Sequence, residues 1–281
     1  MKKSTKKKLW KGTAAAAKGL GKVIFVYPAK SIWRGSRFTY NKIKEANLKR
    51  REIQEKKTQE QQRPKINAQY SPLTEIKLMQ GNYPDFEDKL LTNKSTIGII
   101  LGARGTGKSA IGMRLLENIA AKTEKKLYAL GFKAESLPSW IKVVSSIEEI
   151  ENNSALLIDE GGIEFSSRES MSNANKLLSE ILLIARHKDL SVMFITQNSS
   201  NLEINAIRQA DYLLLKPSSL LQKDFERKKI KEMYEEVQKE FDELKDTTGL
   251  TYIYADSYRG FISNSLPSFW SEGVSKGYAK K

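Results

Sequence analysis

The chain has 281 residues, no cysteine and one histidine, which excludes disulfides, thiolate metal sites and sites that need several histidines. Residues 1–65 hold 20 Lys and Arg against four Asp and Glu, and the remaining residues hold 28 against 29, so the net charge of +15 comes from an N-terminal arm. With 40% hydrophobic residues, the rest of the chain is long and apolar enough for a buried core.

The basic arm, residues 1–65, is expected to be partly disordered or helical, because its last third is polar and lacks residues that could pack. Lys and Arg in such number favour sequence-independent binding to a polyanion such as DNA. Interleaved aromatic residues, including Trp10 and Trp33, could stack on bases or lie in a lipid interface. A solubilising tail is the alternative.

No segment is expected to span a membrane. The apolar run over residues 14–27 resembles a signal sequence, but Lys18 and Lys22 interrupt it and Pro28 ends it. The absence of cysteine fits a reducing compartment. Peripheral attachment to a membrane through residues 1–40 stays open.

After the arm, residues 66–94 look like an irregular lead-in, punctuated by Pro72 and Pro84. From residue 95, apolar runs alternate with amphipathic stretches, which is typical of an α/β core with a mostly parallel sheet covered by helices. We place this core at residues 95–216, followed by a C-terminal helix and tail at 217–281 that packs on the core or on a partner. The expected strands are 97–101, 127–132, 141–144, 155–159, 191–196, 211–215 and 251–255, and the expected helices lie near 108–122, 172–187, 201–208 and 219–245.

The strand at 97–101 leads into the sequence GARGTGKSA, which matches the P-loop pattern G-x-x-x-x-G-K-[S/T]. Glycines let backbone N–H groups curl around a phosphate, and the following helix directs its positive end at the same anion. Lys108 is expected at the β and γ oxygens and the Ser109 hydroxyl on Mg²⁺. Arg104 could touch phosphate or face solvent. The expected nucleotide-binding residues are Gly102, Ala103, Arg104, Gly105, Thr106, Gly107, Lys108, Ser109 and Ala110.

The strand at 155–159 ends in the acid pair Asp159-Glu160. Doubly wound sheets bind ligands at the carboxyl ends of their strands, so Asp159 is expected to hold Mg²⁺ and Glu160 to orient and deprotonate the attacking water. The spacing from Lys108 leaves room for an intervening strand, as in P-loop ATPases that use an acidic base. Because no guanine-binding motif follows, ATP and Mg²⁺ are the expected cofactors.

A third polar cluster follows the strand at 191–196, whose end reads Thr196-Gln197-Asn198. In a parallel sheet this strand can lie next to the P-loop strand, which would place Gln197 near the γ-phosphate as a sensor. An ordinary polar strand end is the alternative.

The loop at 102–110, the Asp159-Glu160 pair and the segment RHKDLSVMFITQNSSNLEINAIRQAD together resemble the FtsK–HerA group of P-loop ATPases, which includes viral DNA-packaging ATPases, and the related Zot-type ATPases. The resemblance covers about residues 95–216. It implies a RecA-like core in a homo-oligomeric ring, a hexamer in many such motors, that uses ATP hydrolysis to move double-stranded DNA through its channel. It also implies an arginine that reaches a neighbouring subunit's γ-phosphate. Arg186 is the first candidate, followed by Arg208 and Arg168.

Three functions stay open at this point. The first is a DNA translocase that packages or pumps a viral or mobile-element genome, with a capsid or portal as partner, in the host cytoplasm or the virion. The second is a Zot-like assembly ATPase of virion morphogenesis or extrusion, whose arm binds a membrane. Residues 216–281 contain no apolar run that would give the membrane span usual in Zot-type proteins, which disfavours this second function. The third is an ATPase that depends on RNA or single-stranded DNA.

Overall fold

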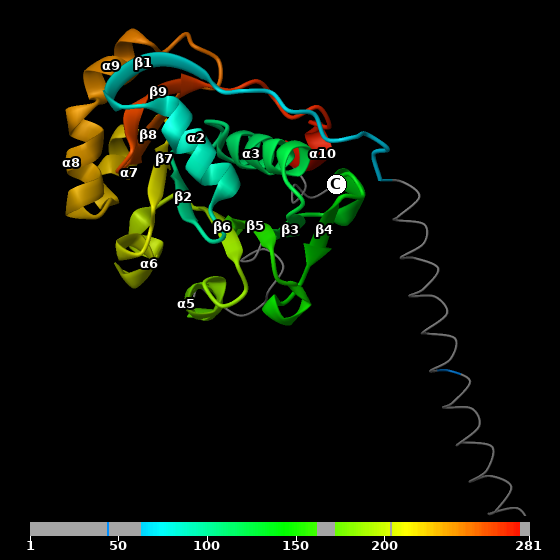
Figure 1. Ribbon diagram of the computed structural model, residues 1–281. Coiled ribbons are helices and arrows are strands. Elements are labelled where there is room, and N and C mark those ends of the chain that lie inside the picture. The colour runs from blue at the N-terminus through cyan, green and yellow to red at the C-terminus, as the bar shows by residue number, and fades with distance from the viewer. Residues whose placement is uncertain (1–43, 45–62, 162–171, 203, 276–281) are drawn as a thin grey trace, which may run out of the picture. The chain divides into compact units, whose positions relative to one another are not determined.

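The computed structural model describes residue 44 and residues 63–161, 172–202 and 204–275 (Figure 1). Most of the basic arm, and with it the predictions made for that arm, lies outside the described residues. So does Arg168. The described residues from Arg63 onward belong to one unit of the chain, which is treated below.

The described residues form a nine-stranded sheet in the order β1-β9-β8-β7-β2-β6-β5-β3-β4. The six strands from β7 to β4 pair in parallel, and β8, β9 and β1 join the β7 edge through antiparallel pairs. This confirms the α/β class with a mostly parallel sheet. The strands are β1 (Thr74–Gly81), β2 (Ile97–Leu101), β3 (Lys126–Leu130), β4 (Ile141–Val144), β5 (Ser154–Asp159), β6 (Leu190–Ile195), β7 (Tyr212–Leu215), β8 (Thr251–Ala255) and β9 (Tyr258–Ser263).

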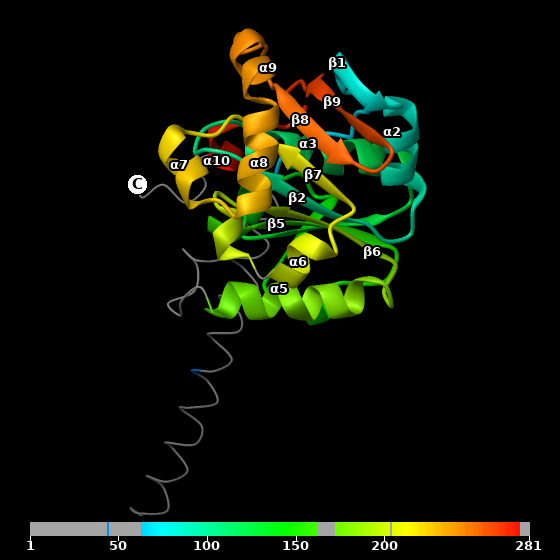
Figure 2. The same ribbon diagram turned by 90° about the vertical axis from the view of Figure 1, so that its left-hand side faces the viewer.

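Helices cover both faces of the sheet: α2 and α3 lie over one face, and α5 and α6 lie over the other (Figures 1 and 2). The α-helices among the described residues are α2 (Tyr83–Thr92), α3 (Lys108–Lys122), α5 (Ser172–Ala185), α6 (Ile204–Arg208), α7 (Leu220–Phe225), α8 (Lys228–Glu236), α9 (Gln238–Glu243) and α10 (Glu272–Ser275). Short 3-10 helices span Ala134–Ser136, Ile147–Glu149 and Ser199–Asn201.

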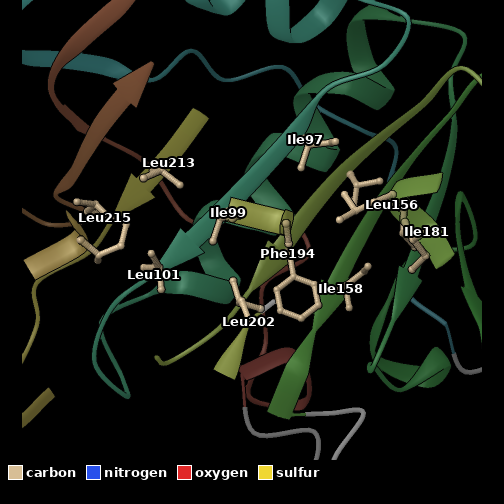
Figure 3. Packing of buried hydrophobic residues seen from close by; sticks show 14 of the residues in the cluster. Ile97, Ile99, Leu101, Leu156, Ile158, Ile181, Phe194, Leu202, Leu213 and Leu215 are labelled. Atoms are coloured by element: carbon tan, nitrogen blue, oxygen red, sulfur yellow. The ribbon is translucent and has the colours of Figure 1, made fainter. Parts of the chain in front are cut away.

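The central strand β2 shows why the sheet is buried on both faces. Successive side chains of a strand point to opposite faces. Ile99 and Leu101 pack in the cluster on the α5 side (Figure 3), whereas Ile100 belongs to the cluster that contains the buried residues of α3. All five residues of β2 are buried. A strand buried on both faces reads as a continuous apolar run, and that run made the parallel strands predictable.

The lead-in departs from the predicted irregular segment, because it contributes the edge strand β1 and the helix α2 to the core. Strand β1 pairs with β9, yet all eight of its residues are exposed, Ile76, Leu78 and Met79 among them, and its apolar residues do not form the longer alternating run that marks a half-buried strand. Pro84 lies in the first turn of α2, a position where proline is tolerated because that N–H has no helical partner. Phe86 and Leu90 of α2 are buried.

The single helix predicted near 219–245 is instead three helices, α7, α8 and α9. The break between α7 and α8 is held by contacts with the segment after β6. Glu226, which is buried, accepts a hydrogen bond from the Ser199 backbone N–H at 2.8 Å, and the Arg227 side chain donates to the Ser199 carbonyl at 3.0 Å. These contacts join residues 27 or 28 positions apart, so helical periodicity alone could not reveal the break.

A buried ion pair on α3 ties the lead-in and the tail to this helix. Arg114 and Glu117 are 4% and 0% exposed, and their side chains meet at 2.7 Å. Glu117 also accepts hydrogen bonds from the backbone N–H groups of Gln69 at 3.2 Å and Ser268 at 3.0 Å. The Arg114 side chain donates to the Ser265 carbonyl at 3.3 Å. Residues before and after the predicted core therefore share one buried charge cluster on α3.

Within the described ranges, none of the helices combines the length and the apolar character that a bilayer crossing requires.

We expect Arg114→Met to lower the free energy of unfolding by about 3–5 kcal/mol, because it leaves the Glu117 carboxylate buried without its cation. Lys229→Met is the matched control, since Lys229 is 73% exposed in its ion pair with Glu232 and its loss should cost about 0–1 kcal/mol. Urea unfolding of both variants measures the difference. Equal midpoints for the two variants would contradict a structural role for the buried pair.

Candidate nucleotide-binding site

The loop of residues 102–110 connects β2 to α3, and the backbone geometry requires glycine at two of its positions. Gly107 has φ of 88° and precedes α3 as its N-cap, and no side chain caps the helix there. Gly102 has φ of 150°, and a Cβ on it would lie 2.5 Å from the Cβ of Lys216. The first backbone N–H groups of α3 lack helical partners, so the loop presents the donors that an anion requires.

The loop is also held to the neighbouring strand β7. The Ala103 N–H donates to the Pro217 carbonyl at 3.0 Å, and the Lys216 N–H donates to the Leu101 carbonyl at 2.8 Å. Thr106 closes the loop on itself, because its hydroxyl donates to the Ala103 carbonyl at 2.8 Å. Arg104 and Gly105 at the tip are exposed, and Ala110 is buried in α3.

Lys108 is buried against the loop that it follows. Its Nζ donates to the carbonyls of Gly102 at 2.8 Å and Ala103 at 2.9 Å. Burial lowers the pKa of Lys108 to about 8, and the carboxylates of Asp159 and Glu160 act in the opposite direction. The ammonium group therefore lies at the loop, within the electrostatic reach of both acids.

The structure brings Ser109 and Asp159 together across the sheet. The Ser109 hydroxyl donates to Asp159 Oδ2 at 3.4 Å, and the Gly161 N–H donates to Oδ1 at 3.1 Å. Strand β6 lies between β2 and β5, so the strand after the acid pair is next to the P-loop strand, as predicted, and β3 and β4 occupy the interval between Lys108 and Asp159 in the sequence. Because these strands are parallel, their carboxyl ends meet at one edge of the sheet.

These two residues fit a magnesium ion that is shared with phosphate. Mg²⁺ prefers oxygen ligands and usually retains several waters, so one hydroxyl and one carboxylate are enough protein groups beside a nucleotide. No cluster of three or more His, Cys, Asp or Glu that could hold a metal by itself occurs in the described ranges. Ser109 and Asp159 would therefore need the phosphates to complete the coordination.

Glu160 is 6% exposed and is held by the end of the neighbouring strand, because the Thr196 hydroxyl donates to its Oε2. Thr196 is itself buried at the end of β6. Gln197 was predicted as a site residue and Thr196 was not, although both belong to the same polar strand end. The Thr-Gln dipeptide was the available signal, and only the fold shows that its first residue contacts the acid.

Gln197 also lies at this edge, directly after Thr196, and it is exposed. Its backbone carbonyl accepts a hydrogen bond from the side chain of Gln222 on α7. The Gln222 side chain also donates to Glu226 at 3.1 Å. Strand β6 is thereby connected to the helices that follow β7.

The candidate arginines lie elsewhere. Arg186 follows α5 and precedes β6, and Arg208 ends α6 before β7, so both lie at the amino ends of the strands, opposite the loop. Both side chains are exposed. Neither reaches the P-loop of its own chain, so a role at a phosphate would require a second subunit.

No protein-family model matches this sequence, and no curated protein matches it. Among solved structures, the chain is similar to the DNA-packaging ATPase B204 from Sulfolobus turreted icosahedral virus, with 17% identity and a TM-score of 0.43 over 61% of this chain and 98% of that one. It is similar to B204 from Sulfolobus turreted icosahedral virus 2 in complex with ATP-gammaS, with 16% identity and a TM-score of 0.40 over 62% and 100% of the two chains.

A third similar structure is EssC (ATPases 2 and 3) from Geobacillus thermodenitrificans, with 12% identity, a TM-score of 0.39 and coverage of 77% of this chain and 49% of that one. These three comparisons describe likeness of fold. The chain carries the predicted P-loop sequence between β2 and α3, in a mostly parallel sheet that helices cover on both faces.

Proposed function

We propose that this chain is a Mg²⁺-dependent ATPase that moves double-stranded DNA, as a genome-packaging or DNA-pumping motor does. The contact that carries the proposal is the one between Ser109 and Asp159, because it joins the phosphate loop to the acid pair at one edge of the sheet. Glu160, held by Thr196, lies next to it in the sequence. The site thus offers separate groups for phosphate, for metal and for water.

Each group has a distinct task in this proposal. The loop N–H groups and Lys108 bind the β- and γ-phosphates. Ser109 and Asp159 would hold Mg²⁺, which would supply positive charge against the phosphate oxygens. Glu160 accepts a proton from the attacking water, and its hydrogen bond with Thr196 fixes the direction of the carboxylate. Gln197, next to Thr196, senses the state of the γ-phosphate.

The proposed substrate to be moved is double-stranded DNA. The support is the charge distribution: the excess positive charge lies in residues 1–65, while the remainder of the chain is close to neutral. A dense run of Lys and Arg binds phosphate backbones irrespective of base sequence, which suits a motor that must move any sequence. A homo-oligomeric ring, with a capsid or portal as its partner, completes this proposal.

We expect Glu160→Gln to bind ATP as the unchanged protein does and to hydrolyse it about 10²–10⁴-fold more slowly, because the amide cannot accept the proton. Lys108→Ala should instead weaken nucleotide binding itself. Thr196→Val, which only removes the donor to Glu160, should lower kcat less than Glu160→Gln does. Equilibrium binding and single-turnover hydrolysis separate these effects. Full turnover by Glu160→Gln would remove this residue as the base.

Long duplex DNA should stimulate ATP hydrolysis, and the stimulation should fall as salt concentration rises, because binding releases counterions from the phosphates. The measurement compares the ATPase rate of the full chain with duplex DNA, single-stranded DNA, RNA and anionic liposomes. Stimulation by liposomes alone would replace DNA translocation with the membrane-associated assembly function. Stimulation confined to RNA or single strands would favour the third function.

We expect Arg186→Ala to impair hydrolysis only through the neighbouring subunit. Mixing Arg186→Ala subunits with Lys108→Ala subunits should then restore part of the activity, because an intact P-loop can meet an intact arginine across the interface. The hydrolysis rate is measured over a series of mixing ratios, with Arg208→Ala as the matched variant. An absence of rescue at every ratio would exclude Arg186 as the shared residue.

A further inference from the structure

A second lysine lies beneath the loop of residues 102–110. Lys216 directly follows β7, and its side chain is 0% exposed. A Cβ on Gly102 would lie 2.5 Å from the Cβ of Lys216, and a Cβ on Gly107 would lie 3.8 Å from its Nζ. The lysine side chain therefore runs along the underside of the loop, from its first glycine to its last.

The partners of the Lys216 ammonium group are neutral. Its Nζ donates to the Gly249 carbonyl at 2.9 Å and to Asn264 Oδ1 at 3.2 Å. Within the described part of the chain it forms no ion pair, and burial alone lowers the pKa of Lys216 to about 7. A buried charge without a counterion is costly, so an anion that binds nearby would be favoured by it. The group beside it is the proposed phosphate-binding loop.

We propose that Lys216 supplies a second positive charge to the nucleotide site, acting through the P-loop backbone to strengthen the binding of nucleotide polyphosphates. This inference rests on the proposed nucleotide-binding function and names a further positioning residue for it. Lys108 contacts the loop carbonyls, whereas Lys216 underlies Gly107, where α3 begins. Because both lysines are buried, water screens their attraction for phosphate less than it would at the surface.

The position of this charge is set by residues outside the P-loop pattern. Gly249 and Asn264 lie on either side of the β8–β9 hairpin, and both bind the Lys216 Nζ. The Tyr234 hydroxyl on α8 donates to the Lys216 carbonyl at 3.1 Å. The C-terminal part of the chain thereby holds the lysine in place under the loop.

The first test is Lys216→Met, which keeps the length of the side chain and removes its charge. We expect binding of the non-hydrolysable analogue AMPPCP with Mg²⁺ to weaken about tenfold or more, as measured by equilibrium titration of the full chain. Lys125→Met is the matched control. Lys125 is also buried and donates to the Asn93 carbonyl at 2.6 Å and the Ser191 hydroxyl at 2.9 Å, but it lies at the amino ends of the strands. The Lys125→Met variant should bind AMPPCP with the same affinity as the unchanged protein.

A second variant separates charge from packing. Asn264→Asp retains Lys216 and places a carboxylate where the amide oxygen now lies, so the lysine gains a counterion and its attraction for phosphate is neutralised. We expect this variant to remain folded and to bind AMPPCP more weakly, in the same direction as Lys216→Met. Inorganic tripolyphosphate, used as a competitor, should lose affinity in parallel, because the effect acts on phosphate and not on the base.

The outcomes are distinguishable. If the unchanged protein binds AMPPCP and either folded variant, Lys216→Met or Asn264→Asp, binds it equally well, the inference is overturned while the nucleotide site stands. If Lys125→Met loses as much affinity as Lys216→Met, the effect is a general one of buried lysines and the inference is again overturned. If the unchanged protein does not bind the analogue, the proposed function itself fails. If Lys216→Met does not fold, the affinity of Asn264→Asp for AMPPCP decides whether the inference holds.

Discussion

The parallel pairing of β6 with both β2 and β5 decides which side chains of this protein can act together. Parallel strands end at the same edge of a sheet, so the loop after β2, the acid pair after β5 and the polar end of β6 converge although they are far apart in sequence. Ser109 and Asp159 lie 50 positions apart and meet at 3.4 Å. In the proposed function, this arrangement places the phosphate-binding loop beside the two acids assigned to metal and water.

The site separates opposite charges around the place proposed for the nucleotide. Lys108 follows the loop and Lys216 lies beneath it. The acids Asp159 and Glu160 lie two strands away, at the carboxyl end of β5. Burial lowers the pKa values of both lysines, to about 8 and about 7, which disfavours their charged forms, and a triphosphate bound at the loop would favour those forms. Asp159 and Glu160 raise the pKa of Lys108 and do not contribute to that of Lys216.

Sequence reasoning predicted the parts of this structure that local patterns encode. The strand at 97–101, the helix at 108–122 and the P-loop between them are found with the predicted bounds, because a buried parallel strand and a glycine-rich turn each have a distinct composition. Contacts between distant residues were not predictable in this way. Thr196 was missed because its role depends on the side chain of Glu160 across a neighbouring strand, and Lys216 because only the fold brings it under the loop.

The central claim is that one triphosphate and its metal touch both the loop of residues 102–110 and the acid pair. A crystal structure of the full chain with Mg²⁺ and AMPPCP tests it most directly. The account predicts the β- and γ-phosphates against the loop N–H groups and Lys108, with the Ser109 hydroxyl about 2.1 Å from the metal and Asp159 within its coordination sphere or one water away. A nucleotide bound elsewhere, or a metal that leaves Asp159 and Glu160 out of reach of the γ-phosphate, would contradict it.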